Sequence, residues 1–126
     1  MRSENSTKKY KLEQARKAVT HGDFFFAEYY NNSGSLKRAP IFVINGDSDP
    51  QDAIICTCTS QRSRSKWDKV VQLKVPTYVR TNKIYTIRKE QLLFKIDCNF
   101  IEEAPEVYAD VMHSIKSVLD CRIKDE

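Results

Sequence analysis

Residues 23–30 read Asp-Phe-Phe-Phe-Ala-Glu-Tyr-Tyr, and the prediction of the fold starts from this stretch. Aromatic residues favour the extended, pleated backbone, so we expect a β-strand over the whole run. His21-Gly22 ends the segment before it, and the polar run 31–35 forms a loop after it. The first part of the folded core is therefore a strand.

Further strand-like segments follow, separated by turn residues. We predict strands at 41–44, 53–60, 67–73, 78–80 and 84–87. Pro40 takes the first position of one strand, Pro76-Thr77 interrupts the pattern before another, and residues 45–50 form a turn. Residues 91–98 suit a strand or a helix equally. Strands this short, spaced about 8–12 residues apart, predict a small β-barrel rather than a parallel sheet.

Helices are predicted on either side of the barrel. Apolar residues near the C-terminal end recur with helical spacing and form one stripe: Ala104, Tyr108, Val111, Met112, Ile115 and Leu119. Asn99 and Glu102 offer a start like a capping box, and Pro105 is tolerated in a first helical turn. Near the N-terminal end, residues 8–20 form a short, weakly amphipathic helix.

Length and composition indicate one compact domain. The chain has 126 residues, of which 40% are hydrophobic and 30% charged, so it folds rather than remaining disordered. We divide it into an N-terminal helical extension (1–20), a barrel domain with its terminal helix (21–121) and a tail (122–126). The longest apolar runs, 24–27 and 41–44, are far shorter than the roughly 20 residues that cross a bilayer. Because the first 20 residues also lack an apolar signal segment, we expect a cytoplasmic protein with no membrane contact.

The four cysteines do not have the spacing of a metal site. Zinc sites favour Cys pairs separated by roughly two to four residues. Here the one close pair is Cys56-x-Cys58, and no second pair follows. Residues two apart on a strand point to the same face, where two thiols pack as small buried hydrophobes. We therefore expect structural thiols and no metal or cofactor, with a metal-binding or redox role as the alternative.

The net charge of +4 is unevenly distributed along the chain. Residues 62–89 carry nine basic side chains and a single acid, Asp68, with Trp67, Tyr78 and Tyr85 among them. Residues 90–126 carry four basic side chains against nine acidic ones. A solvated face explains many charge runs. A basic run of this density with interleaved aromatic residues predicts contact with a polyanion, most simply nucleic acid, and the acidic C-terminal third should lie away from it.

Four segments occur in an order and at a spacing that resemble a known family. They are Gly22-Asp23-Phe24-Phe25-Phe26, Lys37-Arg38-Ala39-Pro40-Ile41-Phe42-Val43-Ile44, Thr59-Ser60-Gln61 and Val79-Arg80-Thr81-Asn82-Lys83-Ile84-Tyr85-Thr86-Ile87. Together they resemble the MazF/PemK toxins, the ribosome-independent endoribonucleases of bacterial toxin–antitoxin pairs. The resemblance implies a mainly β fold, a small SH3-like β-barrel with a C-terminal helix, to which this chain adds its N-terminal extension. It also implies a homodimer and a cognate antitoxin, whose acidic, flexible segment covers the RNA groove.

The resemblance further implies cleavage of single-stranded RNA without metal. A general base takes the proton of the 2′-hydroxyl, the oxygen attacks the adjacent phosphorus, and an acid protonates the leaving 5′-oxygen. Fixed cations and hydrogen-bond donors stabilise the charge that develops on the phosphate. DNA resists this reaction because the nucleophile is the substrate's own 2′-hydroxyl.

By the same resemblance, three residues form the catalytic set. Thr59 matches the threonine at a strand end, and Arg80 matches the second arginine, which acts as acid or phosphate clamp. Arg38 takes the place of the first arginine, one residue before the matching slot, which Ala39 occupies. On a strand such a slip turns the side chain to the other face, whereas a loop absorbs it. Where some members carry an aspartate base the chain has Asn82, whose amide cannot accept a proton. The predicted RNA-binding residues are Lys37, Gln61, Arg62, Arg64, Lys66, Asn82 and Lys83.

Two alternatives to an RNA-cleaving toxin stay open. Ala39 and Asn82 suit a catalytically inactive relative that binds RNA or a protein. The other alternative is a barrel of the same superfamily that poisons topoisomerase by protein contact, against which the basic run counts. A histidine-driven ribonuclease is not expected, since His21 has no evident partner and His113 lies in the terminal helix.

Overall fold

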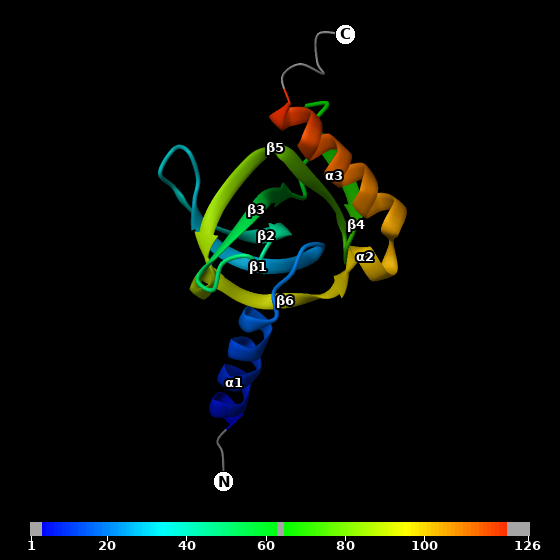
Figure 1. Cartoon of the computed structure of the whole chain (residues 1–126). Helices are drawn as coiled ribbons and strands as arrows, with labels where there is room; N and C mark the ends of the chain where they lie inside the picture. The colour runs from blue at the N-terminus through cyan, green and yellow to red at the C-terminus, as the bar shows by residue number, and fades with distance from the viewer. Residues whose placement is uncertain (1–3, 63–64, 121–126) are drawn as a thin grey trace.

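Six strands form one antiparallel sheet that curls into a small barrel, with helices before and after it (Figure 1). The computed structural model describes residues 4–62 and 65–120; the side-chain description excludes residues 4–8, 97 and 98. The elements in chain order are α1 (Glu4–Lys17), β1 (Asp23–Tyr30), β2 (Leu36–Asn45), β3 (Asp52–Thr59), β4 (Asp68–Gln72), β5 (Pro76–Arg88), the 3-10 helix η1 (Lys89–Gln91), β6 (Leu92–Asn99), α2 (Phe100–Glu103) and α3 (Pro105–Leu119). The prediction of a mainly β barrel with a helix before and after it is confirmed.

The strand order is β4-β5-β3-β2-β1-β6, which leaves β4 and β6 at the edges of the sheet. Strand β5 is the longest, and it pairs with β4 through its first residues and with β3 along most of its length. A hydrophobic core fills the inside of the curl, and a second one lies between the sheet and helix α3. Both faces of the central strands are therefore covered.

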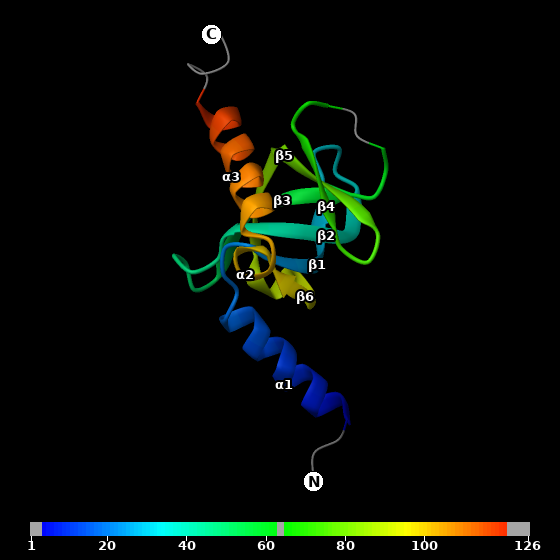
Figure 2. The same ribbon diagram turned by 90° about the vertical axis from the view of Figure 1, so that its right-hand side faces the viewer.

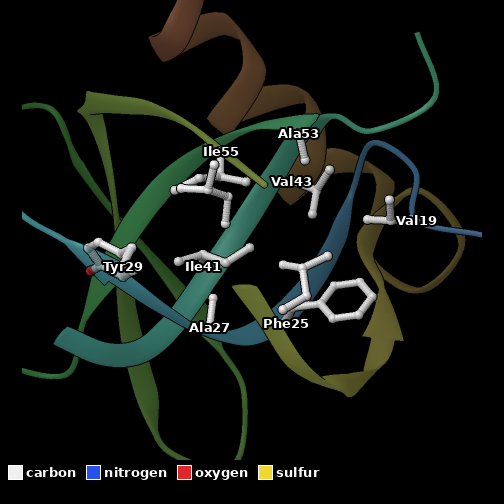
Figure 3. Packing of buried hydrophobic residues seen from close by; sticks show 10 residues of the cluster. Val19, Phe25, Ala27, Tyr29, Ile41, Val43, Ala53 and Ile55 are labelled. Carbon is white, nitrogen blue, oxygen red and sulfur yellow. The ribbon is translucent and has the colours of Figure 1, made fainter. Parts of the chain in front are cut away.

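Strand β1 has the predicted bounds and contributes to both cores. Phe25, Ala27 and Tyr29 point into the inner core, which Figure 3 shows. Phe24 points the other way, with its ring centroid 5.2 Å from that of Phe42. Because successive side chains of a strand alternate between faces, the run of three phenylalanines fills the barrel and its outer layer at once.

Strand β2 begins earlier than predicted, so Pro40 lies inside the strand and not at its first position. Residues 36–40 pair with β1 alone, and pairing with β3 begins only at Ile41, opposite Thr57. A strand segment with a single neighbour tolerates a residue that lacks an N–H group. The predicted position of Pro40 was therefore wrong, although the strand itself was predicted.

Two further strand predictions needed correction. The segments 78–80 and 84–87 belong to one continuous strand, β5, which starts at Pro76 and runs through Thr77 without interruption. The predicted break was wrong, because a proline at the first position of a strand does not interrupt that strand. The ambiguous segment 91–98 is strand β6, whose neighbour is β1.

The helices differ from prediction mainly at their ends. The Asn99 side chain accepts a hydrogen bond from the Ile101 N–H at 2.9 Å, so it caps the short helix α2, whereas α3 begins separately at Pro105. The predicted cap of the terminal helix was therefore wrong. Its apolar stripe packs on the outer core, except that Leu119 is exposed.

Helix α1 spans Glu4–Lys17 rather than residues 8–20 and extends away from the barrel, on the side opposite α3 (Figure 2). Its last turn is attached to β6, because Arg16 donates hydrogen bonds to the carbonyl oxygens of Leu92 and Glu90. No helix within the described ranges is both long and apolar enough to span a bilayer.

Gly22 and Asp23 join the start of β1 to the end of β6. Gly22 has a φ of +89°, and its N–H donates to the Val43 carbonyl at 2.9 Å. The buried carboxylate of Asp23 accepts hydrogen bonds from Asn99 Nδ2 at 2.6 Å and from the Thr20 N–H at 3.1 Å. The Gly-Asp pair therefore fixes where the first strand enters the sheet.

We predict that Gly22→Ala destabilises the protein more than Gly34→Ala does. Both glycines have positive φ, so each alanine carries backbone strain of roughly 1–2 kcal/mol. A Cβ on Gly22 would also lie 3.0 Å from Ile101 Cγ1 and 3.2 Å from Asn99 Oδ1, whereas nothing lies within 4 Å at Gly34. Urea unfolding of both variants measures the difference; equal losses would contradict the close packing at Gly22.

Candidate functional site

A pocket of about 740 Å³ opens where the sheet separates. The first half of β2 pairs only with β1, while Cys58 and Thr59 at the end of β3 pair only with β5. The two pairs of strands diverge beyond the Ile41–Thr57 contact. Residues of β1, the 31–33 segment, β2, the end of β3 with residues 60–61, and residues 75–85 line the opening between them.

Four cationic side chains line this pocket: Lys37, Arg38, Arg80 and Lys83. Among the described residues that line it there is no aspartate, glutamate or histidine. Two of the four, Arg38 and Arg80, lie within 4 Å of the carboxylates of Glu28 and Asp68, which are outside the lining, so the concave surface itself carries cations and has a positive potential that attracts anions. None of the acidic residues described after residue 89 lines the pocket.

A bend in β5 brings Arg80 and Lys83 to the pocket. Val79 lies opposite Cys58, but Ile84 lies opposite Cys56, so residues 80–83 of β5 face a single residue of β3. Such a bulge bends the strand and redirects its side chains. Behind the pocket, Arg80 Nε lies 3.8 Å from the carboxylate of Asp68, a residue whose side chain is 2% exposed.

Thr59 ends β3 at the edge of the same pocket. Its hydroxyl oxygen accepts a hydrogen bond from the Gln61 N–H at 3.1 Å. This contact occupies one lone pair and leaves the hydroxyl hydrogen available for an acceptor in the pocket. Thr59 and Arg80, the two residues that match the family motif most directly, therefore line one cavity.

Tyr29 lines the pocket too, and sequence reasoning did not select it. Its ring meets that of Tyr85 edge-on, with centroids 5.8 Å apart. Burial raises the pKa of Tyr29 to about 12, with further increases from Cys58 and Tyr85 and an opposing effect from Arg80. The phenol is therefore a protonated hydrogen-bond donor at neutral pH. Its side chain points into the barrel because side chains alternate between the two faces of β1, and Phe25 and Ala27 point the same way.

Arg38 lies on a strand and not in a loop, so the backbone does not absorb the one-residue slip. Ala39 packs against the inner core, whereas Arg38 Nε contacts Glu28 Oε1 at 3.3 Å in a cross-strand pair. Its side chain is 66% exposed. Of the two possibilities for this position, the structure has the strand, and Arg38 borders the pocket while paired with an acid.

The remaining predicted RNA-binding residues divide into two groups. Lys37, Gln61 and Lys83 line the pocket. Arg62, Lys66 and Asn82 do not line it, and Arg64 lies outside the described residues. The Lys66 ammonium lies 4.9 Å from the centre of the Trp67 ring, a cation–π distance.

The thiols of Cys56 and Cys58 are buried. Burial raises the pKa of Cys56 to about 12 and that of Cys58 well above its ordinary value, so both remain protonated. This agrees with the expected structural role of the two thiols. The side chains of Cys98 and Cys121 lie outside the description. Within the described side chains, no three His, Cys, Asp or Glu residues gather in a way that would hold a metal ion.

Comparison with known proteins gives a clear result for the fold. By sequence, the chain matches no family profile and no curated protein. By structure, an endoribonuclease from Mycobacterial species matches with a TM-score of 0.63 at 14% identity, over 81% of this chain and 91% of its own. The same class of enzyme in complex with its cognate antitoxin gives 0.64 at 14% identity, over 81% and 95%. MazF from Deinococcus radiodurans gives 0.65 at 14% identity, over 80% and 96%.

These matches show that the chain has the same fold as the solved endoribonucleases. More particularly, the chain has the MazF/PemK-like fold, and the resemblance found in its sequence is confirmed at this level.

We predict that the protein loses stability between pH 10 and pH 12 partly through Tyr29. Because the folded-state pKa is raised from 10.0 to about 12, the contribution is fully present below pH 10 and is lost as the pH rises through 12. The loss amounts to about 2 kcal/mol at pH 12. Urea unfolding across this pH range should show a smaller loss for Tyr29→Phe than for wild type or for the exposed-site control Tyr30→Phe. Equal losses in all three would contradict the assignment.

Proposed function

We propose that this chain is the toxin of a type II toxin–antitoxin pair, a metal-independent endoribonuclease that cleaves single-stranded RNA. The observation that carries the proposal is the acid-free pocket that holds Thr59 and Arg80 together with three further cations. A pocket of this charge suits a phosphate chain, and the MazF/PemK-like fold is consistent with that substrate. The nucleophile in this reaction is the 2′-hydroxyl next to the phosphate that is cut.

The pocket supplies donors for the charge that develops on phosphorus. Arg80 and Lys83 balance the additional negative charge, and Arg80 is the group nearest in kind to the phosphate clamp of the family. Thr59 donates its hydroxyl hydrogen, and the protonated phenol of Tyr29 donates a second hydrogen bond. Donors fixed before the substrate arrives need no rearrangement during the reaction.

A proton acceptor of ordinary carboxylate or imidazole type is missing from the lining residues that the structure describes. Tyr29 does not serve as a base at neutral pH, because its pKa is about 12. The proton of the 2′-hydroxyl therefore passes to solvent in this proposal. The 2′-oxygen then bonds to phosphorus while the P–O5′ bond breaks, and the leaving 5′-oxygen takes a proton from water. Under such specific-base conditions the cleavage rate rises with pH and has no optimum near neutrality.

The residues around the pocket extend the contact with RNA. Lys37 and Arg38, which lie on β2, reach the phosphates on one side of the cut in this proposal. Gln61 follows the end of β3, in the other pair of strands. Arg38 acts as a secondary phosphate contact, since Glu28 competes for its guanidinium. Arg62, Arg64, Lys66 and Asn82 contact flanking nucleotides in this proposal.

The partners in this proposal follow the family. An acidic antitoxin segment would match the charge of the pocket and exclude RNA from it. The structure of a mycobacterial endoribonuclease with its cognate antitoxin is a precedent for such a pair. We also propose that the chain works as a cytoplasmic homodimer, that residues 21–121 form the RNA-cleaving domain, and that residues 1–20 are an appended extension.

A second candidate is a catalytically inactive relative that binds RNA without cutting it. Two observations favour it: the lining residues provide no conventional base, and Arg38 is turned toward Glu28. The two candidates share the same binding pocket. They differ only in whether bound RNA is cleaved.

Arg80→Ala should lower the rate of RNA cleavage by at least about 100-fold, because one preorganised charge is removed from the transition state. The assay uses a long single-stranded RNA with a chelator present, and maps the ends for 2′,3′-cyclic phosphate. Arg88→Ala is the matched control, since Arg88 lies on the same strand, pairs with Glu90 and does not line the pocket. A substrate with 2′-deoxyribose at the cut site should resist cleavage. RNA that binds wild-type protein and is never cut would support the inactive relative instead.

Binding and cleavage should respond differently to pH and salt. RNA affinity should stay constant between about pH 5 and pH 8, because the described residues that line the pocket include no acid or imidazole, while the cleavage rate rises about tenfold per pH unit. The logarithm of affinity should fall with the logarithm of salt concentration by roughly 0.7 per phosphate contact, and Lys83→Ala should remove about one contact. Fluorescence anisotropy measures affinity, and a bell-shaped rate profile would show that a conventional acid–base pair acts at the site.

A further inference from the structure

The bend of β5 that carries Arg80 is attached to helix α3 on the far side of the sheet. Thr81, the next residue, is fully buried, and its hydroxyl oxygen lies 2.7 Å from Ser114 Oγ on α3. Figure 2 shows α3 lying along β5. Ser114 is itself buried, so the contact is made without competing water.

The hydrogen-bond directions in this contact can be assigned. Thr81 Oγ1 donates to the carbonyl oxygen of Trp67 at 2.6 Å, and the Thr81 N–H donates to the same oxygen at 3.1 Å. Because a threonine has a single hydroxyl hydrogen, Ser114 must donate to Thr81. A chain of hydroxyl groups, Ser114 to Thr81 to the Trp67 carbonyl, therefore joins α3, β5 and the start of β4.

This hydroxyl chain lies one residue away from both members of the Arg80–Asp68 ion pair. Trp67 precedes Asp68, and Thr81 follows Arg80, which lies opposite Asp68 in the strand register. Arg80 Nε lies 3.8 Å from Asp68 Oδ1, longer than a direct hydrogen bond, and it is buried with no hydrogen-bond partner among the described residues. A small movement of the bend would close this gap, because a charge-assisted bond of Arg80 to Asp68 is favourable.

We propose that Ser114 and Thr81 are positioning residues, which hold the bend of β5 so that Arg80 stays available to the pocket instead of closing onto Asp68. Loss of the hydroxyl chain lets the guanidinium form a direct bond with the carboxylate, and the pocket loses that charge. The consequence for catalysis rests on the proposed function. The effect of the two hydroxyl groups on the position of Arg80 does not depend on that function.

The test compares Thr81→Val and Ser114→Ala with Thr81→Ser, which keeps the hydroxyl group. Ser117→Ala is the matched control, because Ser117 lies on α3 and its hydroxyl donates to the His113 carbonyl of its own helix. We expect kcat for RNA cleavage to fall about 10-fold to 100-fold in Thr81→Val, and less in Ser114→Ala, with a smaller change in KM. Thr81→Ser and Ser117→Ala should retain wild-type rates. Thermal unfolding identifies any variant that fails to fold.

Two readouts separate positioning from general destabilisation. The Nε–Hε NMR resonance of Arg80, assigned by its absence in Arg80→Lys, should move downfield in Thr81→Val and Ser114→Ala as the bond to Asp68 forms. Adding Asp68→Asn to Ser114→Ala should restore cleavage, since no carboxylate then captures Arg80. An unchanged resonance in Thr81→Val would overturn the proposal. If wild-type protein does not cleave RNA, the proposed function fails, while the resonance still decides the positioning role.

Discussion

The structure depends on the separation of two pairs of strands at one point in the sheet. Pairing between β2 and β3 stops at the contact of Ile41 with Thr57, and beyond it each strand keeps only its outer neighbour. Backbone groups that no longer face a partner strand face an open space instead. Side chains from both pairs of strands can therefore approach one ligand from two sides.

Two acids contact arginines of the pocket without being among its lining residues. Glu28 contacts Arg38, and the buried Asp68 faces Arg80. An acid in this position leaves the lining of the pocket cationic, whereas an acid within the pocket would neutralise the charge that attracts an anion. Asp68, the single acid in the basic stretch 62–89, is therefore explained structurally as the ion-pair partner of Arg80.

Local patterns predicted much of the fold but only part of the candidate site. The aromatic run of β1 and the stripe of α3 were predictable, because each follows the period of its own element. The pairing of residues 36–40 with β1 alone was not, since it depends on where β3 leaves β2, and this placed Arg38 on a strand. The bend at residues 80–83 has no local signal either, because the irregularity exists only relative to β3.

The attachment of α1 has a consequence for how the sheet can grow. Arg16 donates to the Leu92 carbonyl from two of its nitrogen atoms, so the carbonyl at the start of the edge strand β6 is already hydrogen-bonded within the chain. A foreign segment that added itself as a seventh strand would have to displace this guanidinium. At the other margin, β4 pairs with β5 alone and carries the exposed Val70. An extended peptide that pairs with β6 at Leu92 therefore competes with Arg16 of the same chain.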